Sequence, residues 1–310
     1  ETLMYMGNEC PHVRYAPHPF APFKSTLDIK VGHNVDISSS AVIIPKQNVC
    51  LGAGEQLSHE AGFTWDNEVP ETPAITVNEF TSSTKPVTNA EFADFFHDGG
   101  YRSKEFWVES NEFAVDVVRA EDKDDDPSKS WTWVQKHDVQ MMPVMWEVTN
   151  KELGNKGSLS VRTLCDGPVS FEEGSCGWPA MVTLYEAKAF CRWRGGGSRI
   201  MTELEYQAHF TDDSDFKKAA YNGNNNWKYR GFVPVGSMDD STGYGCHDLV
   251  GNGWEWTTSI FEEFPNFQPL PIYPEYSTDF FDGKHYVLKG AGPFSAASYT
   301  RRSFRNFFQP

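Results

Sequence analysis

The fold is decided by the stretch Asp248-Leu249-Val250-Gly251-Asn252-Gly253-Trp254-Glu255-Trp256-Thr257. Glycines flank Asn252, which indicates backbone with positive φ or the close approach of another group. Trp254 and Trp256 alternate around Glu255, so a short strand places both indoles on one face and the carboxylate on the other. By spacing alone, this pattern predicts a buried tryptophan pair with an acid at the surface. Residues 245–309 as a whole are too dense in glycine, aromatic, hydroxyl and arginine side chains for a plain core.

The composition bounds the class of protein. The chain has 310 residues, of which 39% are apolar and 15% aromatic, enough for one large domain or two ordinary ones with a ring-rich core. The net charge of −16 argues against nucleic acid and against an anionic membrane surface as partners, because both need basic patches. No apolar run in the sequence reaches the length of a membrane span.

The cysteines and the chain ends bear on where the protein resides. The six cysteines are scattered and form no Cys-x-x-Cys pair, which favours reduced thiols in an intracellular, cytoplasmic protein. A bridge between Cys165 and Cys176 is the alternative. The chain starts at Glu1 and stops directly after a hydrophobic run, so we interpret it as a piece of a longer one in which a missing signal peptide proves little.

Three capping boxes predict the starts of three short helices, at Thr88 with Glu91, Thr183 with Glu186, and Thr202 with Glu205. Glycine pairs or triplets at residues 99–100 and 195–197 end the first two helices. Residues 222–240 are expected to form a loop. Short strands are predicted at residues 42–45, 49–52, 74–77 and 131–134. The class is therefore α+β, with short helices, short strands and much irregular chain, and not a βαβ fold.

Several segments together resemble one known family. In consistent order over roughly residues 42–308, they are similar to the formylglycine-generating-enzyme-like domain, also called the sulfatase-modifying-factor domain. The resemblance implies a loop-rich α+β fold related to C-type lectins, with short antiparallel strands. The segments are Pro86-Val87-Thr88-Asn89-Ala90-Glu91-Phe92, Gly177-Trp178-Pro179, Glu186-Ala187, Phe190-Cys191-Arg192-Trp193, Arg199-Ile200-Met201-Thr202-Glu203-Leu204-Glu205, residues 248–257, and Ser303-Phe304-Arg305-Asn306.

Three further segments narrow the resemblance. Phe63-Thr64-Trp65-Asp66-Asn67-Glu68, Tyr273-Pro274-Glu275-Tyr276-Ser277 and Phe280-Phe281-Asp282-Gly283 are similar to the iron-dependent sulfoxide synthases of ergothioneine biosynthesis. That resemblance implies an oxidoreductase that uses non-haem Fe(II) and O2. It joins the thiol of cysteine or γ-glutamylcysteine to the imidazole of hercynine, and the sulfur becomes a sulfoxide.

The same resemblance implies a partner domain. In this family a DinB-like helical domain comes first and binds Fe(II) through histidines, and Glu1-Thr2-Leu3 is similar to the chain just past its His-x-x-x-His motif. We therefore expect residues 1–12 to be the tail of a truncated DinB-like domain. Residues 13–41 would be a linker, and residues 42–310 the formylglycine-generating-enzyme-like domain with its last strand cut short. The iron ligands would lie upstream of residue 1, so this piece alone would be inactive.

Two tyrosines are the candidate catalytic residues. The resemblance places a Tyr-x-x-Tyr pair at Tyr273 and Tyr276, where the second domain must donate a proton during the O2-dependent step. A tyrosine hydroxyl suits that role because its pKa near 10 keeps it protonated at neutral pH. The alternative is that both are half-buried aromatics with satisfied hydroxyls.

Arg301, Arg302 and Arg305 are the candidate carboxylate-binding residues, because guanidinium binds carboxylate in a bidentate manner. The alternative is internal pairing with Asp or Glu. Phe307 and Phe308 are the candidates for facing the trimethylammonium group of hercynine. Phe308 departs from the bacterial members, which have Asp there, and residues 290–294 depart from the usual Gly-Gly-Ser-Trp.

Asn252, Gly253 and Glu255 match positions that bind calcium in some relatives, so a structural Ca²⁺ is also expected there. Three other functions compete with the first. A formylglycine-generating enzyme needs two cysteines near the arginine-rich segment, and residues 299–309 contain none. An ovothiol-type sulfoxide synthase, which takes histidine, stays open. So does a catalytically silent lectin-like binding module, which the departures at Phe308 and residues 290–294 favour.

Overall fold

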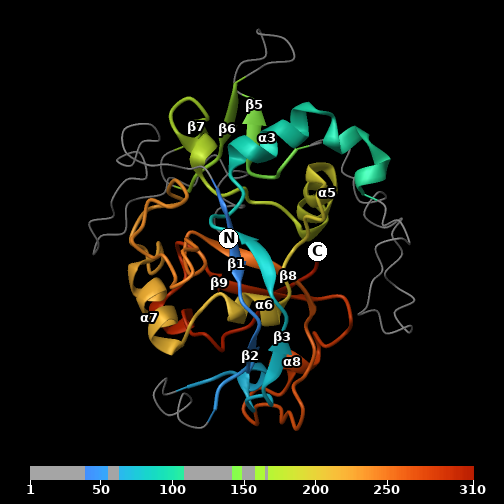
Figure 1. Cartoon of the computed structure of the whole chain (residues 1–310), viewed down its shortest axis with the longest axis vertical. Coiled ribbons are helices and arrows are strands. Elements are labelled where there is room, and N and C mark those ends of the chain that lie inside the picture. Colours follow the sequence, from blue (N-terminus) through green and yellow to red (C-terminus); the bar gives the residue numbers. More distant parts are fainter. Residues whose placement is uncertain (1–38, 55–62, 108–141, 149–157, 165–166) are drawn as a thin grey trace.

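The computed structural model describes residues 39–54, 63–107, 142–148, 158–164 and 167–310 (Figure 1). The predicted domain tail at residues 1–12, most of the linker and the predicted strand at residues 131–134 lie outside these ranges. Within them, no helix is both long enough and apolar enough to cross a membrane.

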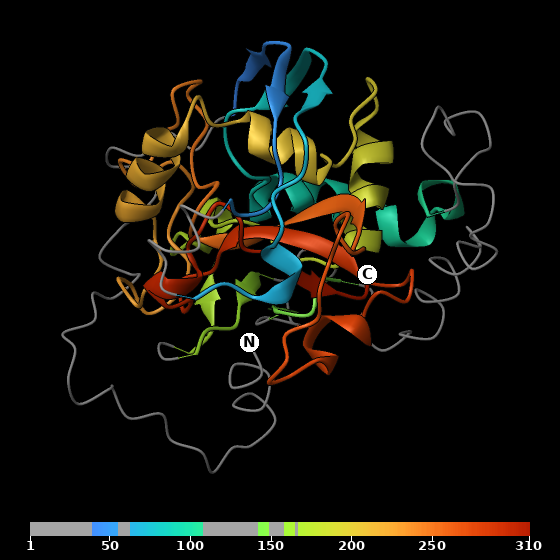
Figure 2. The ribbon, with the colours of Figure 1, turned by 90° about the horizontal axis from the view of Figure 1, so that it is seen from below.

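Short antiparallel strands form four small sheets in the described residues. The central sheet has the order β10-β9-β8, and its strands run across the middle of the molecule in Figure 2. The others are β5-β6-β7, β1-β4 and β2-β3. The strands are β1 (Ala41–Ile44), β2 (Gln47–Val49), β3 (Ile75–Val77), β4 (Phe80–Ser83), β5 (Trp146–Val148), β6 (Leu159–Val161), β7 (Val169–Ser170), β8 (Gly253–Ile260), β9 (Tyr286–Ala291) and β10 (Asn306–Phe308).

All three predicted capping boxes are present. They begin α3 (Asn89–His97), α5 (Leu184–Arg194) and α6 (Glu203–Ala208). At α3, the Thr88 hydroxyl accepts from the Glu91 backbone N–H at 3.2 Å, and the Glu91 carboxylate accepts from the Thr88 N–H at 2.9 Å. Each box therefore satisfies two backbone donors that the helix itself leaves unpaired. The loop-rich α+β class is confirmed.

Two helices carried no prediction. In α7 (Asp213–Asn222), only Phe216 and Ala219 are buried, so few apolar residues mark this mostly polar helix in the sequence. Its start is fixed by Asp212, whose carboxylate accepts from the Asp215 N–H at 2.9 Å. The other is α8 (Glu275–Thr278), a single turn. Short 3₁₀ turns are η2 (Asp66–Glu68), η3 (Gly100–Arg102), η4 (Lys104–Phe106), η7 (Ser175–Gly177) and η8 (Ala297–Tyr299).

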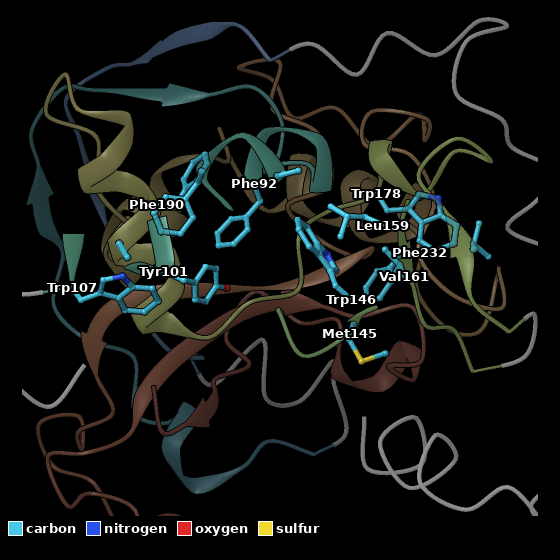
Figure 3. Close-up of a cluster of buried hydrophobic side chains, with 14 residues drawn as sticks. Phe92, Tyr101, Trp107, Met145, Trp146, Leu159, Val161, Trp178, Phe190 and Phe232 are labelled. Carbon is cyan, nitrogen blue, oxygen red and sulfur yellow. The ribbon is translucent and has the colours of Figure 1, made fainter. Parts of the chain in front are cut away.

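Two apolar clusters hold these elements together. Figure 3 shows the first, in which rings from α3, α5 and the β5–β6 region interlock, with Phe92 stacked on Phe190 at 5.4 Å. The second packs α6 and α7 against β1, β2 and the 246–250 segment, around Tyr206 and Phe210. The second cluster includes Tyr206 and Ala208 of α6 and Ala291 of β9, and these two elements carry the polar groups behind the candidate site.

The fold-deciding stretch behaves as predicted in its backbone. Asn252 has a φ of 60°, and Gly251 a φ of 113°. A Cβ on Gly251 would lie 2.7 Å from the backbone nitrogen of Asn224, so the glycine allows two loops to meet. Trp256 donates its indole N–H to the Val182 carbonyl at 2.9 Å. The predicted contrast between buried tryptophans and a surface acid is wrong, because Trp254, Glu255 and Trp256 are all half-buried. Burial of the Glu255 carboxyl group raises its pKa to about 7.

This buried carboxyl makes stability depend on pH. The folded-state pKa of Glu255 lies above its model value of 4.5, so its contribution is fully present below about pH 4.5 and is lost as the pH rises through about 7. The quantity to compare is the unfolding free energy of Glu255→Gln minus that of the wild type. We expect this difference to be about 1–3 kcal/mol larger at pH 8 than at pH 5. Urea denaturation at both pH values measures this difference. Glu79→Gln, at an exposed position, is the control. If Glu255→Gln differed from the wild type by the same free energy at both pH values, the expectation would be contradicted.

Candidate functional site

Three segments far apart in the sequence meet at β10 of the central sheet. They are the η2 loop with Trp65, the α8 turn, and residues 301–308. The Trp65 indole lies parallel to the Tyr276 ring, with the ring centroids 3.7 Å apart and an interplanar angle of 12°. Phe63 packs edge-on against Trp65 at 4.9 Å, Tyr273 against Tyr276 at 5.9 Å, and Phe307 against Tyr276 at 6.1 Å. We call these five rings the aromatic wall.

Hydrogen bonds under the rings fix α8 to the η2 loop. The Ser277 hydroxyl accepts from the Asn67 amide at 3.0 Å and donates to the Asp66 carboxylate. The second oxygen of Asp66 accepts from the Leu270 N–H at 3.2 Å. Asp66, Asn67 and Ser277 are all buried, so water does not compete for these bonds. The Trp65–Tyr276 stack is thus set by a rigid base.

The wall has an exposed and a shielded part. Tyr273 is 51% exposed and Phe63 is 47% exposed, so both can meet a ligand from solvent. Tyr276 is half-buried, and burial raises the pKa of its hydroxyl above the ordinary value of 10.0. The carboxylates of Glu68 and Asp66 and the neighbouring Tyr299 raise it further, while Arg301 lowers it. Tyr276 therefore stays protonated well into the alkaline range.

The three candidate arginines are bound within the protein. Arg301 pairs with the buried Glu68 through two nitrogens, one of them at 3.1 Å. Arg302 donates to the Gln207 side chain at 2.9 Å and lies 3.4 Å from Asp213. Arg305 is 3% exposed and binds Glu203 at 3.0 Å. Internal pairing thus describes all three. Arg301 and Arg305 both contact the η2 loop, Arg301 at the Glu68 carboxylate and Arg305 at the Asn67 carbonyl at 3.3 Å.

A buried ionic network lies behind the arginine-rich segment, and the sequence patterns did not single it out. Glu203 of α6 pairs with Arg305 at 3.0 Å and with Lys289 of β9 at 3.7 Å. The Lys289 ammonium also donates to the carbonyls of Arg302 at 3.0 Å and Phe304 at 2.6 Å. Burial lowers the pKa of Lys289 to about 8. A lysine inside the apolar run Val287-Leu288-Lys289-Gly290 was the available signal for it.

Of the predicted calcium ligands, the Asn252 side chain is already bound by other groups of the protein. The Asn252 side-chain oxygen accepts from the Val233 N–H at 2.9 Å and the Asn224 amide at 3.1 Å, and its amide donates to the Val233 carbonyl. Across the described ranges, no group of three or more His, Cys, Asp or Glu side chains could hold a metal ion. The described residues therefore do not fit an iron site. The calcium site stays a prediction.

Two of the four cysteines in the described part of the chain are poor nucleophiles at neutral pH. Cys50, Cys176, Cys191 and Cys246 are free thiols, while Cys165 lies outside the described residues. Burial raises the pKa of Cys191 and of Cys246 to about 11, so neither is a reactive thiolate near neutral pH.

The departure at residues 290–294 is part of a packed corner. Gly290 has a φ of 87°, and a Cβ there would lie 2.6 Å from the Leu249 carbonyl oxygen. Phe294 packs against Trp227 with the ring centroids 4.7 Å apart, and the Trp227 N–H donates to the Pro293 carbonyl at 2.9 Å. The other departure, Phe308, ends up 45% exposed beside the wall on β10.

Comparison with known proteins identifies relatives of several kinds. The chain is 27% identical to "Ergothioneine biosynthesis protein 1" of Schizosaccharomyces pombe, over 91% of this chain and 30% of that protein. It is 26% identical to "Hercynine oxygenase" of Mycolicibacterium smegmatis, over 88% and 59%. It is also 27% identical to "Inactive C-alpha-formylglycine-generating enzyme 2" of Bos taurus, over 78% and 79%.

The chain therefore spans less than two thirds of the first two relatives. The family described as "Sulfatase-modifying factor enzyme 1-like domain" matches residues 35–310, which contain every element of the aromatic wall. The short antiparallel sheets, the three capped helices and the loop-rich remainder agree with the architecture that the sequence led us to expect. On this match, the chain belongs to the sulfatase-modifying factor enzyme 1-like family.

Proposed function

We propose that this chain is the C-terminal catalytic-domain part of a non-haem Fe(II), O2-dependent sulfoxide synthase of ergothioneine biosynthesis. The enzyme joins a cysteine-type thiol to the imidazole of hercynine. The names of the yeast and mycobacterial relatives support this assignment. The observation that carries it is the aromatic wall, in which Trp65 and Tyr276, from two segments that suggested this enzyme family, lie stacked at 3.7 Å.

In this proposal the wall binds hercynine and supplies a proton. Tyr273 and Tyr276 are the acids, with Tyr273 reaching toward solvent and Tyr276 held protonated behind it. Phe307, 6.1 Å from Tyr276, is the ring at the wall for the trimethylammonium group, and Phe308 follows it on β10 with its side chain on the opposite face. All three arginines are bound within the protein, Arg301 to Glu68 and the Ser298 carbonyl, Arg302 to Gln207 and Arg305 to Glu203, so in this proposal they steady the segment beside the wall.

The iron and its ligands are assigned to a DinB-like domain that precedes this chain in the full-length protein. Activation of O2 is the chemistry that the metal supplies there. No step on this domain is routed through it, because the described residues do not fit an iron site. The acidic charge and the free thiols support a reducing, cytoplasmic setting for the whole enzyme.

The assignment is tested with the full-length protein loaded with Fe(II). Hercynine or histidine is offered with cysteine or γ-glutamylcysteine in all four combinations, and products are identified by mass spectrometry. A hercynine-derived sulfoxide is the expected product. A histidine-derived sulfoxide would instead identify the ovothiol-type enzyme, and no product from any pair with iron bound would reject the enzyme assignment.

A silent binding module is the second candidate, and one observation favours it. Phe308 is exposed where bacterial members carry an acid, so that position cannot bind a cation through a carboxylate. The Bos taurus relative carries the word inactive in its name. Binding of hercynine to the iron-loaded protein without any product would support this alternative.

A further inference from the structure

Glu68 is the buried carboxylate at which three parts of the site converge. Its side chain is completely buried. One oxygen accepts from the Trp65 backbone N–H at 3.0 Å and from Arg301, and the other accepts from Arg301 at 3.1 Å and from the Ser303 hydroxyl at 2.6 Å. The residue thus ties the η2 loop to the segment that leads into β10. A charge buried this deeply is stable only because these donors surround it.

Through its own loop, Glu68 fixes an aromatic ring. The Glu68 N–H also donates to the Trp65 carbonyl at 3.1 Å, which closes a tight turn between the two residues. The indole that this turn holds covers the Tyr276 ring at 3.7 Å, with Phe63 edge-on beside it. A carboxylate that does not touch the substrate therefore sets the place of a tyrosine that lies at the site.

Glu68 also acts on Tyr276 through its charge. The charged and titratable groups that act on the Tyr276 hydroxyl are Glu68 and Asp66 from η2, Tyr299 from η8, and Arg301. Tyr273, on the turn that leads into α8, adds a neighbouring phenol ring. Both carboxylates disfavour the phenolate, and Arg301 favours it. With Glu68 neutral, Arg301 would lose its counter-charge. Its positive charge would then act on Tyr276 without the opposing charge of Glu68.

We propose that Glu68 is a positioning residue that fixes the Trp65 indole against Tyr276 and preserves the Tyr276 hydroxyl as a proton donor. This inference deepens the proposed function, because it says how the acid of that site is held ready. It assigns a role to a side chain that makes no contact with solvent.

The test is the Glu68→Gln variant of the full-length, iron-loaded protein. The ionisation of Tyr276 is followed by tyrosinate absorbance, as the difference between each protein and its Tyr276→Phe counterpart. Ionisation of the Tyr276 hydroxyl should begin about one pH unit lower in Glu68→Gln than in the wild type. The variant lacks the Glu68 carboxylate, so its charge no longer opposes that of Arg301. This reading needs no turnover, so it succeeds or fails independently of the product assay.

Glu91→Gln is the matched control. Glu91 accepts a backbone N–H three residues earlier, as Glu68 does, but at the start of α3 in the other part of the fold. The control should leave the Tyr276 titration and the pH profile of kcat unchanged, whereas Glu68→Gln should lose kcat more steeply at alkaline than at neutral pH. An unchanged Tyr276 titration in Glu68→Gln, or a kcat lowered equally at every pH, would overturn the proposal, since a purely structural role predicts both.

Discussion

Glu203→Gln is expected to lose about 3–5 kcal/mol of unfolding free energy, one of the two largest effects that this structure predicts. Glu203 is the shared anion of two buried cations, Arg305 at 3.0 Å and Lys289 at 3.7 Å. Removing its charge leaves both cations without an opposing charge at the same point, where water cannot solvate them. Urea denaturation of the variant and the wild type measures the loss.

Two further variants identify the cause of that loss. Asp213→Asn removes a 3.4 Å pair with Arg302 at a 42% exposed carboxylate, so it should change stability by at most about 1 kcal/mol. Adding Lys289→Met to Glu203→Gln removes one of the unpaired cations and should recover part of the loss. A Glu203→Gln variant no less stable than Asp213→Asn would show that the network does not support the fold.

Tyr273→Phe is expected to lower kcat by about 10²- to 10⁴-fold in the full-length enzyme, or to divert its product. The substitution removes only the hydroxyl, and at 51% exposure the ring has room to keep its place beside Tyr276. One of the two proposed acids, the one that reaches toward solvent, is lost while the aromatic wall remains, so the KM for hercynine should change little. Steady-state kinetics combined with mass spectrometry of the products measures both effects.

Tyr221→Phe is the control for that variant, because Tyr221 is an 84% exposed tyrosine at the end of α7. It should behave as the wild type. A Tyr273→Phe enzyme with the wild-type rate and the wild-type products would remove Tyr273 from the catalytic residues.

Local chemistry made much of the fold predictable from sequence. The three capping boxes are interactions between residues three apart, and each begins a helix where it was expected. The alternation of Trp254 and Trp256 likewise marked β8. The polar helix α7 was not predicted because only two of its residues, Phe216 and Ala219, are buried, which leaves few apolar positions to mark it.

The site was less predictable, because what assembles it is non-local. Arg301 and Glu68 are 233 positions apart, and Asn67 and Ser277 are 210 apart, so no spacing rule connects them. The arginines show the consequence. Their clustering suggested carboxylate binding, yet Arg305 is 3% exposed and its charge is met by Glu203 from α6. The ionic network around Lys289 was not predicted for the same reason. The partners that stabilise a buried charge are brought to it only by folding.

The central claim is that the aromatic wall around Trp65 and Tyr276 binds hercynine. The most direct measurement is the indole N–H resonance of Trp65 in the full-length protein, assigned by its disappearance in Trp65→Phe, as hercynine is added. The account predicts that the Trp65 signal shifts in a saturable way, while that of Trp227, 41% exposed on a separate loop, stays in place. A Trp65 signal that does not move at hercynine concentrations sufficient for full turnover would contradict it.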